Sequence, residues 1–169
     1  MNVEERLKTE YGVDFDEVLE VWLGSHLSQE LPEPYGRLCQ EVVFRLPWDW
    51  DENETWDVTV DWVASSQCYA SVLREEDADG APCTITVYPA LMDRLSDPAC
   101  RWVFAHEFAH IASGLRVGSI VVHGKPYTQV RAGEYEAAPA KTVHEDAADR
   151  IAMEWGFTSE HTAWLAEDA

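Results

Sequence analysis

Hydrophobic residues recur along the first third of the chain at the spacing of an amphipathic helix. Apolar residues three and four apart share one face in residues 14–23, and the same spacing returns in residues 34–46. These two segments are each long enough for a helix of ordinary length. The pattern therefore predicts a helical N-terminal part over residues 1–55.

The pattern then changes to runs rich in β-branched and aromatic residues, which are typical of strands. Three such runs follow one another, at residues 56–66, 67–75 and 83–90. The polar stretch EEDADGAP separates the last two and is a turn signal. The sequence predicts an antiparallel sheet over 55–88, with a hairpin near residue 79, and assigns residues 55–90 to the sheet part of the domain.

Helical spacing returns in the last part of the chain. Ser96-Asp97-Pro98 resembles a helix start and Gly114 a stop, which predicts a helix over about 98–113. A loop-rich stretch follows, and similar signals predict helices over 142–156 and 159–166. The 97–156 part thus holds two helices and their connection. We expect one α+β domain over residues 1–169, with a small antiparallel or mixed sheet packed on these helices.

The net charge of the chain indicates which classes of binding partner to exclude. The chain has 169 residues and a formal net charge of −20, with 12 Lys and Arg against 32 Asp and Glu. Such a chain repels phosphate, so we expect no nucleic-acid partner and no anionic membrane surface. The start lacks an apolar signal-peptide core, and the four cysteines form no CxxC pair. A cytoplasmic protein with reduced cysteines is the expectation.

The candidate chemistry lies in residues 103–114, VFAHEFAHIASG, which contain His-Glu-x-x-His at His106, Glu107 and His110. Residues four apart lie one turn apart on one helix face, so both imidazoles can bind one metal ion. Glu107 can reach a metal-bound water without being a ligand. Zinc lowers the pKa of bound water to about 7, and a nearby carboxylate can then take the proton. The motif predicts metal-binding histidines and a catalytic glutamate.

A third ligand is expected because catalytic zinc sites normally have three protein ligands and one open position. Residues 142–153, TVHEDAADRIAM, offer Glu145 as that ligand. Asp149, one turn later, can accept a hydrogen bond from the far nitrogen of a ligand histidine, which fixes the ring. Alanines on both helices provide small faces on which the two helices can pack closely.

The pair HEFAH and EDAAD resembles the HExxH…ExxxD pattern of gluzincin metallopeptidases such as thermolysin. The short gap is more similar to the compact ImmA-like and HtpX-like peptidases, and the resemblance covers about residues 90–158. It implies a zincin fold, in which an edge strand of the sheet holds the substrate beside an active-site helix and a glutamate helix. CTITVYPA, residues 83–90, would suit that edge strand.

Two assignments have alternatives. Thr142-Val143-His144-Glu145 is also a capping box, in which Glu145 would bond to the backbone instead of a metal ion. His144 is then the replacement ligand, with Asp149 a more distant choice. Asp149 can alternatively pair with Arg150 or Lys141 at the surface.

A peptidase also needs a donor for the developing oxyanion. His123, Tyr127 and Tyr135 lie between the two motifs and are the candidates, with no basis for a choice among them. His26 and His161 lie outside the motif region, and we expect them at the surface.

Together these residues predict a zinc metallopeptidase that hydrolyses a protein or peptide substrate and holds one Zn²⁺ per chain. Glu107 activates the attacking water and passes its proton to the leaving amine. The same ligand set suits manganese or iron. The alternatives are a catalytically inactive, acidic binding or regulatory module on the same scaffold, and a metal-free α+β interaction protein.

Overall fold

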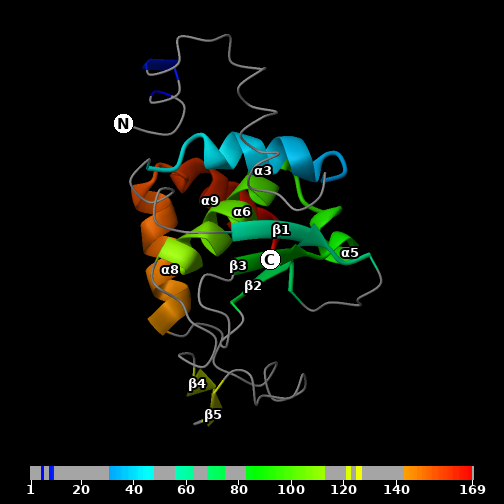
Figure 1. Ribbon diagram of the computed structural model, residues 1–169, viewed down its shortest axis with the longest axis vertical. Helices are drawn as coiled ribbons and strands as arrows, with labels where there is room; N and C mark the ends of the chain where they lie inside the picture. Colours follow the sequence, from blue (N-terminus) through cyan, green and yellow to red (C-terminus); the bar gives the residue numbers. More distant parts are fainter. Residues whose placement is uncertain are drawn as a thin grey trace.

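The computed structural model describes residues 5, 8–9, 31–47, 56–62, 68–74, 83–112, 121–122, 125–126 and 143–168. The N-terminal and central helices are α3 (Tyr35–Val43), α5 (Pro89–Met92) and α6 (Asp97–Ala112). Helices α8 (Val143–Glu154) and α9 (Thr158–Glu167) follow, and the strands are β1 (Trp56–Val60), β2 (Ala70–Arg74), β3 (Cys83–Val87), β4 (Val121–Val122) and β5 (Lys125–Pro126). The fold is α+β, with helices and a three-stranded sheet (Figure 1).

Helices α3, α6, α8 and α9 lie close to where the sequence predicts them, whereas the short helix α5 was not predicted and begins inside the expected strand 83–90. Helix α6 begins beside Pro98, and α8 ends at Glu154, before Gly156 with a φ of 94°. The amides of Gly156 and Phe157 bond back to the carbonyls of Met153 and Ala152, which is the Schellman arrangement that glycine favours. The predicted helix over 14–23 and the Gly114 stop lie outside the described residues.

The sheet is mixed, which is one of the two expected forms, but the fully antiparallel arrangement predicted for residues 55–88 is wrong. Strands β2 and β3 pair antiparallel, as a hairpin requires, but β1 pairs parallel to β3. The strand order is β1-β3-β2, so β3 lies between the two strands that precede it in sequence. Residues 61–69 separate β1 from β2 along the chain. Periodicity predicts that a segment is a strand but not which neighbour it pairs with.

The expectation that residues 83–90 form the edge strand is also wrong. Strand β3 is central, and it ends at Val87 because Pro89 starts the short helix α5. The edge strands of this sheet are β1 and β2. Of these, β2 has the more extensive backbone contact with α6, while β1 reaches α6 through the ring of Trp56, which packs on Phe108. Both edge strands therefore pack against the histidine helix.

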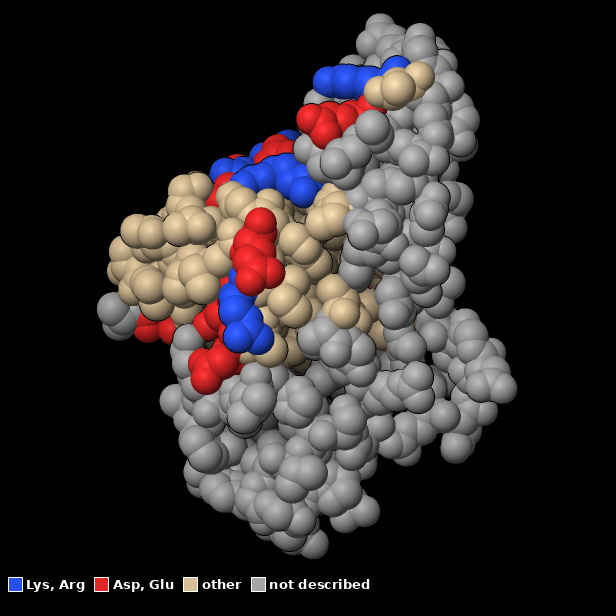
Figure 2. Space-filling view, turned by 90° about the vertical axis from the view of Figure 1, so that its left-hand side faces the viewer, with Lys and Arg blue, Asp and Glu red and all other residues tan. Residues whose placement is uncertain are grey.

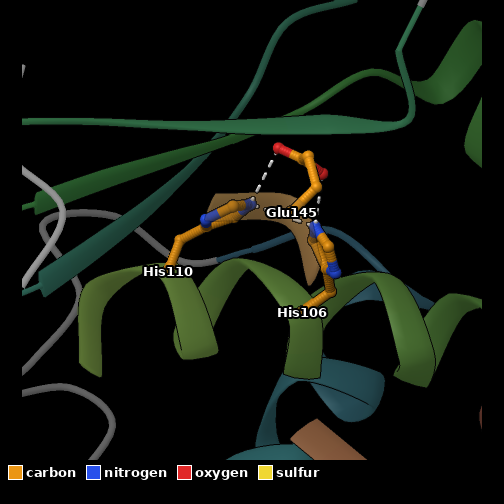
Figure 3. A group of neighbouring side chains, drawn as sticks. All are labelled: His106, His110 and Glu145. Carbon is orange, nitrogen blue, oxygen red and sulfur yellow. Dashed lines mark hydrogen bonds and ion pairs between the residues drawn. The ribbon is translucent and has the colours of Figure 1, made fainter. Parts of the chain in front are cut away.

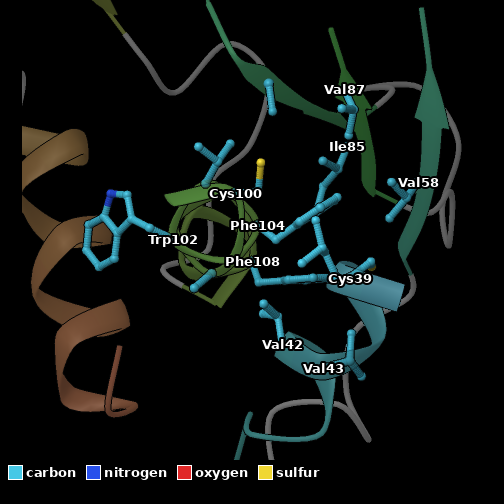
Figure 4. Packing of buried hydrophobic residues seen from close by; sticks show 14 of the residues in the cluster. Cys39, Val42, Val43, Val58, Ile85, Val87, Cys100, Trp102, Phe104 and Phe108 are labelled. Carbon is cyan, nitrogen blue, oxygen red and sulfur yellow. The ribbon is translucent and has the colours of Figure 1, made fainter. Parts of the chain in front are cut away.

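Helix α6 is the centre of the described structure and contacts α3, α8, α9 and β2. Phe104 and Phe108 point from it towards the sheet and α3, while Trp102 points to the opposite side (Figure 4). All three are buried, and Phe108 meets Trp56 edge-to-face with ring centroids 4.9 Å apart. A helix buried on nearly all sides holds its polar residues in fixed positions.

The alanine faces pack as the sequence predicts. Ala105 and Ala109 of α6 and Ala148 and Ala152 of α8 are each fully buried, and the two helices are in contact. Small residues let the backbones approach closely, which brings α8 side chains over the histidine face of α6.

Cys39, Cys83 and Cys100 are buried and Cys68 is half-buried, and all four are free thiols. Burial raises the pKa of Cys39 and of Cys100 to about 12, so both thiols are poor nucleophiles at neutral pH.

Among the described residues, no helix combines the length and the apolar character that crossing a membrane requires.

An ion pair ties α9 to the end of α3. Arg45 Nη1 lies 2.5 Å from Glu160 Oε1, and Glu160 is buried. The second Arg45 nitrogen donates to the carbonyl of Gly156, and the guanidinium lies 3.9 Å above the Phe157 ring. Burial raises the pKa of Glu160, but the hydrogen bond from Arg45 outweighs it, so the net shift is downward.

Glu160→Gln is expected to lower the free energy of unfolding by about 1–2 kcal/mol at pH 7, because Arg45 is left without its carboxylate. A lowered folded-state pKa stabilises the protein above the unfolded value of about 4.3, and this contribution is lost as pH falls through the folded pKa. The difference between wild type and variant, measured by urea unfolding, should therefore shrink in acid. Glu154→Gln, at an exposed position of α8, is the control and should cost under about 0.5 kcal/mol. Equal losses in both variants would contradict the prediction.

Candidate metal centre

His106, His110 and Glu145 converge on one point between α6 and α8 (Figure 3). The two histidines project from successive turns of α6, and Glu145 reaches them from the first turn of α8. His106 Nε2 lies 3.0 Å from His110 Nε2 and 3.1 Å from Glu145 Oε2. The other carboxylate oxygen, Oε1, lies 3.3 Å from His110 Nε2. These residues could hold a metal ion.

The distances between these donor atoms fit a bound ion. A tetrahedral ion with bonds of about 2.0–2.1 Å holds its donors about 3.3 Å apart. Here the two imidazole nitrogens are 3.0 Å apart, each lies 3.1 Å or 3.3 Å from a different oxygen of Glu145, and the ligand atoms of the three residues all lie within 4.8 Å of one another. Two imidazole nitrogens and a carboxylate oxygen directed at one point form an electron-rich set, which a cation satisfies better than the three groups satisfy each other.

Asp149 fixes the orientation of His106. Its Oδ1 lies 2.9 Å from His106 Nδ1, and Asp149 is buried. An ionised carboxylate only accepts hydrogen bonds, so Nδ1 carries the hydrogen. In the neutral ring, Nε2 is then left with its lone pair towards the point where the three donors meet. The predicted hydrogen bond between Asp149 and the far nitrogen of a candidate ligand histidine is therefore present. The alternative, a surface pair with Arg150 or Lys141, is not required to explain the position of Asp149.

The charges at this point are strongly coupled. Burial lowers the pKa of His106, but the hydrogen bonds to Asp149 and Glu145 outweigh it and raise the pKa to about 10. Burial raises the pKa of Glu145, and the hydrogen bonds from the two histidines outweigh that effect, so its pKa lies well below the usual range. Both shifts show that the site favours positive charge beside Glu145, either as a proton or as a cation.

Glu107 follows His106 in α6 and is buried. Burial raises the pKa of its carboxyl group, while the nearby histidines lower it in part. A carboxylate with a raised pKa is a better proton acceptor near neutral pH than an exposed one. The Glu107 side chain therefore has the electrostatic character that a general base needs.

Trp102 and His161 form a part of this region that the sequence did not indicate. Trp102 lies one turn before His106, and their ring centroids are 6.1 Å apart. His161 of α9 also packs on Trp102, and the centroids of the two rings are 4.3 Å apart. The expectation that His161 is a surface residue is thus wrong, since its ring is half-buried against Trp102 and Trp164. No local pattern links α6 to α9, so sequence spacing could not reveal this packing.

Several sequence candidates lie outside the described residues: His26, His123, Tyr127 and Tyr135. The backbone of His144 belongs to α8, but its side chain is outside the described part as well. The capping-box alternative for Glu145 involves Thr142, which is also outside it. The carboxylate oxygens of Glu145 lie within hydrogen-bond distance of the histidines, and this is the contact that a metal ligand needs.

Comparison with known proteins leaves the chain without a family assignment. No family model matches it, and no curated protein or solved structure is significantly similar to it. The function must therefore be argued from the site.

Proposed function

We propose that this protein is a zinc-dependent metallopeptidase, in which His106, His110 and Glu145 bind the zinc ion. The observation that carries the proposal is the convergence of two imidazole nitrogens, 3.0 Å apart, with the carboxylate of Glu145, whose ligand atoms all lie within 4.8 Å of one another. Two histidines and one glutamate are a ligand set of catalytic zinc, with one position left for water or substrate. The resemblance of HEFAH and EDAAD to gluzincins supports the same assignment.

The residues of the chain divide the work of peptide hydrolysis. A bound zinc ion would lower the pKa of water and polarise the peptide carbonyl. Glu107 takes the proton of the attacking water and passes it to the leaving amine. Asp149 holds the His106 ring through Nδ1, so that Nε2 keeps its direction.

Strand β2 is the place for an extended substrate. It is an edge strand, it packs against α6, and it has only β3 as a strand partner among the described residues. A peptide can add to such an edge through main-chain hydrogen bonds, with its scissile bond carried past the histidine face of α6. The sequence-based expectation gave this role to residues 83–90, but β3 is central in the sheet, and the proposal therefore uses β2.

The experiment that tests this function combines metal analysis with cleavage. Protein stripped with a chelator is titrated with zinc, and one tightly bound equivalent per chain is expected. The zinc-loaded protein is then incubated with a randomised library of fluorescence-quenched peptides, before and after removal of zinc with 1,10-phenanthroline. Cleavage that needs zinc supports the proposal. Failure to bind zinc, or zinc binding without any cleavage, contradicts it; the latter outcome favours the inactive binding module.

A further inference from the structure

We infer that His161 is a positioning residue of the proposed metal centre. Its ring holds Trp102 against His106, so that helix α9 helps to fix the direction of a metal-binding nitrogen. This inference rests on the proposed function, because it concerns the same candidate ligands. It adds to them a residue that lies on neither α6 nor α8, the two helices that bear the sequence motifs.

The ring of His106 receives one hydrogen-bonded restraint from α8. Asp149 Oδ1 lies 2.9 Å from Nδ1, and this contact fixes one corner of the ring. The ring can still tilt about the line that joins the two bonded atoms. Such a tilt would move Nε2, which lies 3.0 Å from Nε2 of His110, away from the point where the candidate ligands meet. A second restraint, on the side of the ring, keeps Nε2 in place.

Trp102 contacts the His106 ring from within α6. It lies one turn before His106, and the two ring centroids are 6.1 Å apart at an interplanar angle of 51°. The indole is buried and points away from the sheet (Figure 4). Residues four apart share one helix face, but the indole has other rotamers that would leave His106 uncovered. A contact from outside α6 is therefore required to keep Trp102 against His106.

Two rings of α9 provide that outside contact. His161 lies nearest, with its centroid 4.3 Å from that of Trp102 at an interplanar angle of 35°. The Trp164 centroid is 6.5 Å from that of Trp102 and 6.1 Å from that of His161, and its ring is nearly parallel to the His161 ring. Aromatic rings at these separations attract one another. His161 thus completes a series of ring contacts that runs from α9 through Trp102 to His106.

Helix α9 is anchored at both ends, which gives its rings a fixed position. Near its start, the buried Glu160 lies 2.5 Å from Arg45 at the end of α3. At its other end, Glu167 accepts hydrogen bonds from the amide and the hydroxyl of Ser96, just before α6. On the side of the molecule that carries α8, described acidic and basic side chains lie next to one another, as such ion pairs require (Figure 2). His161, next to Glu160, is therefore presented to Trp102 by a helix that is held in place.

The test measures metal binding, so that it does not depend on finding a substrate. Zinc affinity is measured by competition with a chelating dye, and the visible absorption of the cobalt(II) form reports the geometry of the ligands. His161→Ala removes the ring, whereas His161→Phe keeps a flat ring without the imidazole nitrogens. His161→Gln is a second ring-free variant, which keeps more of the side-chain volume if the alanine variant does not fold. Val58→Ala, in the core on β1, is the control for a general loss of stability, which urea unfolding of each metal-free protein measures.

Both ring-free variants should bind zinc about three- to tenfold more weakly, less than the about 10- to 100-fold cost of losing a directly bonded partner of a ligand. Their cobalt spectra should differ from that of the wild type. His161→Phe should restore zinc affinity to within about twofold of wild type and restore the spectrum, because the ring contact is what acts. Val58→Ala should lose stability but keep the wild-type affinity and spectrum.

Wild-type affinity and spectrum in both ring-free variants would overturn the inference and leave the metal site intact. An equal loss of affinity in Val58→Ala would also overturn it, because affinity would then follow stability instead of the ring contact. Failure of His161→Phe to restore binding would show that the imidazole acts by its nitrogens, which contradicts a packing role. Absence of zinc binding in the wild type would overturn the proposed function, and this inference with it, so the two failures are distinguishable.

Discussion

Glu107→Gln is expected to reduce peptide cleavage by about 10²–10⁴-fold, because the amide cannot accept the proton of the attacking water. The change preserves size and leaves His106, His110 and Glu145 in place, so one equivalent of zinc should remain bound. Glutamine also removes a buried ionisable group whose pKa is raised by burial, so the fold should not be weakened by loss of a charge. Measurements of kcat/KM and zinc stoichiometry on the same preparation decide the point.

A matched control separates this effect from a general loss of charge. Glu154→Gln makes the same chemical change at an exposed position of α8, and its activity should stay within about twofold of wild type. Unchanged cleavage in Glu107→Gln would refute its role as the base. Loss of zinc together with activity would instead show that Glu107 supports the ligands, and the catalytic assignment would have to move elsewhere.

Local features of the sequence were sufficient for helices α3, α6, α8 and α9 and for the positions of the candidate ligands along them. Helix α6 has a recognisable start at Pro98, and α8 has a recognisable end at Gly156, because both depend on backbone conformations that particular residues favour. His106 and His110 share a face through the helix repeat alone. The contact between α6 and α8 was also predictable, since alanines mark the faces on which both helices pack.

Contacts between segments that are distant along the chain could not be predicted from the sequence. Whether β1 lies beside β2 or beside β3 depends on how the chain crosses the sheet, and the residues of a strand look the same in either order. This error assigned the edge strand to residues 83–90, which form the central strand β3 instead. The packing of His161 on Trp102 was missed for a similar reason, because it joins α9 to α6 through a tertiary contact with no sequence spacing of its own.

Removing a ligand is expected to abolish the stabilisation that zinc gives the fold. At a zinc concentration about 1,000 times Kd, binding to the native state adds about 4 kcal/mol. For a domain of this size, that corresponds to a rise in Tm of about 8–15 °C. His110→Ala and Glu145→Ala should each show almost no rise, because two remaining donors bind zinc weakly. Thermal melts with and without zinc measure the effect, and the zinc-free melts report whether each variant folds.

The neighbouring residue in α8 supplies the control that the third ligand requires. His144→Ala should keep the full zinc-dependent rise in Tm, because in this arrangement Glu145 is the α8 residue whose oxygens meet the two histidines. Asp149→Asn should keep one equivalent of zinc with affinity lowered about 10- to 100-fold, since the His106 ring loses its carboxylate partner. If the zinc-dependent rise in Tm were retained in Glu145→Ala and lost in His144→Ala, His144 would be the ligand and Glu145 a helix cap. A rise retained in His110→Ala would remove the metal site altogether, and with it the reason for placing a catalytic base at Glu107.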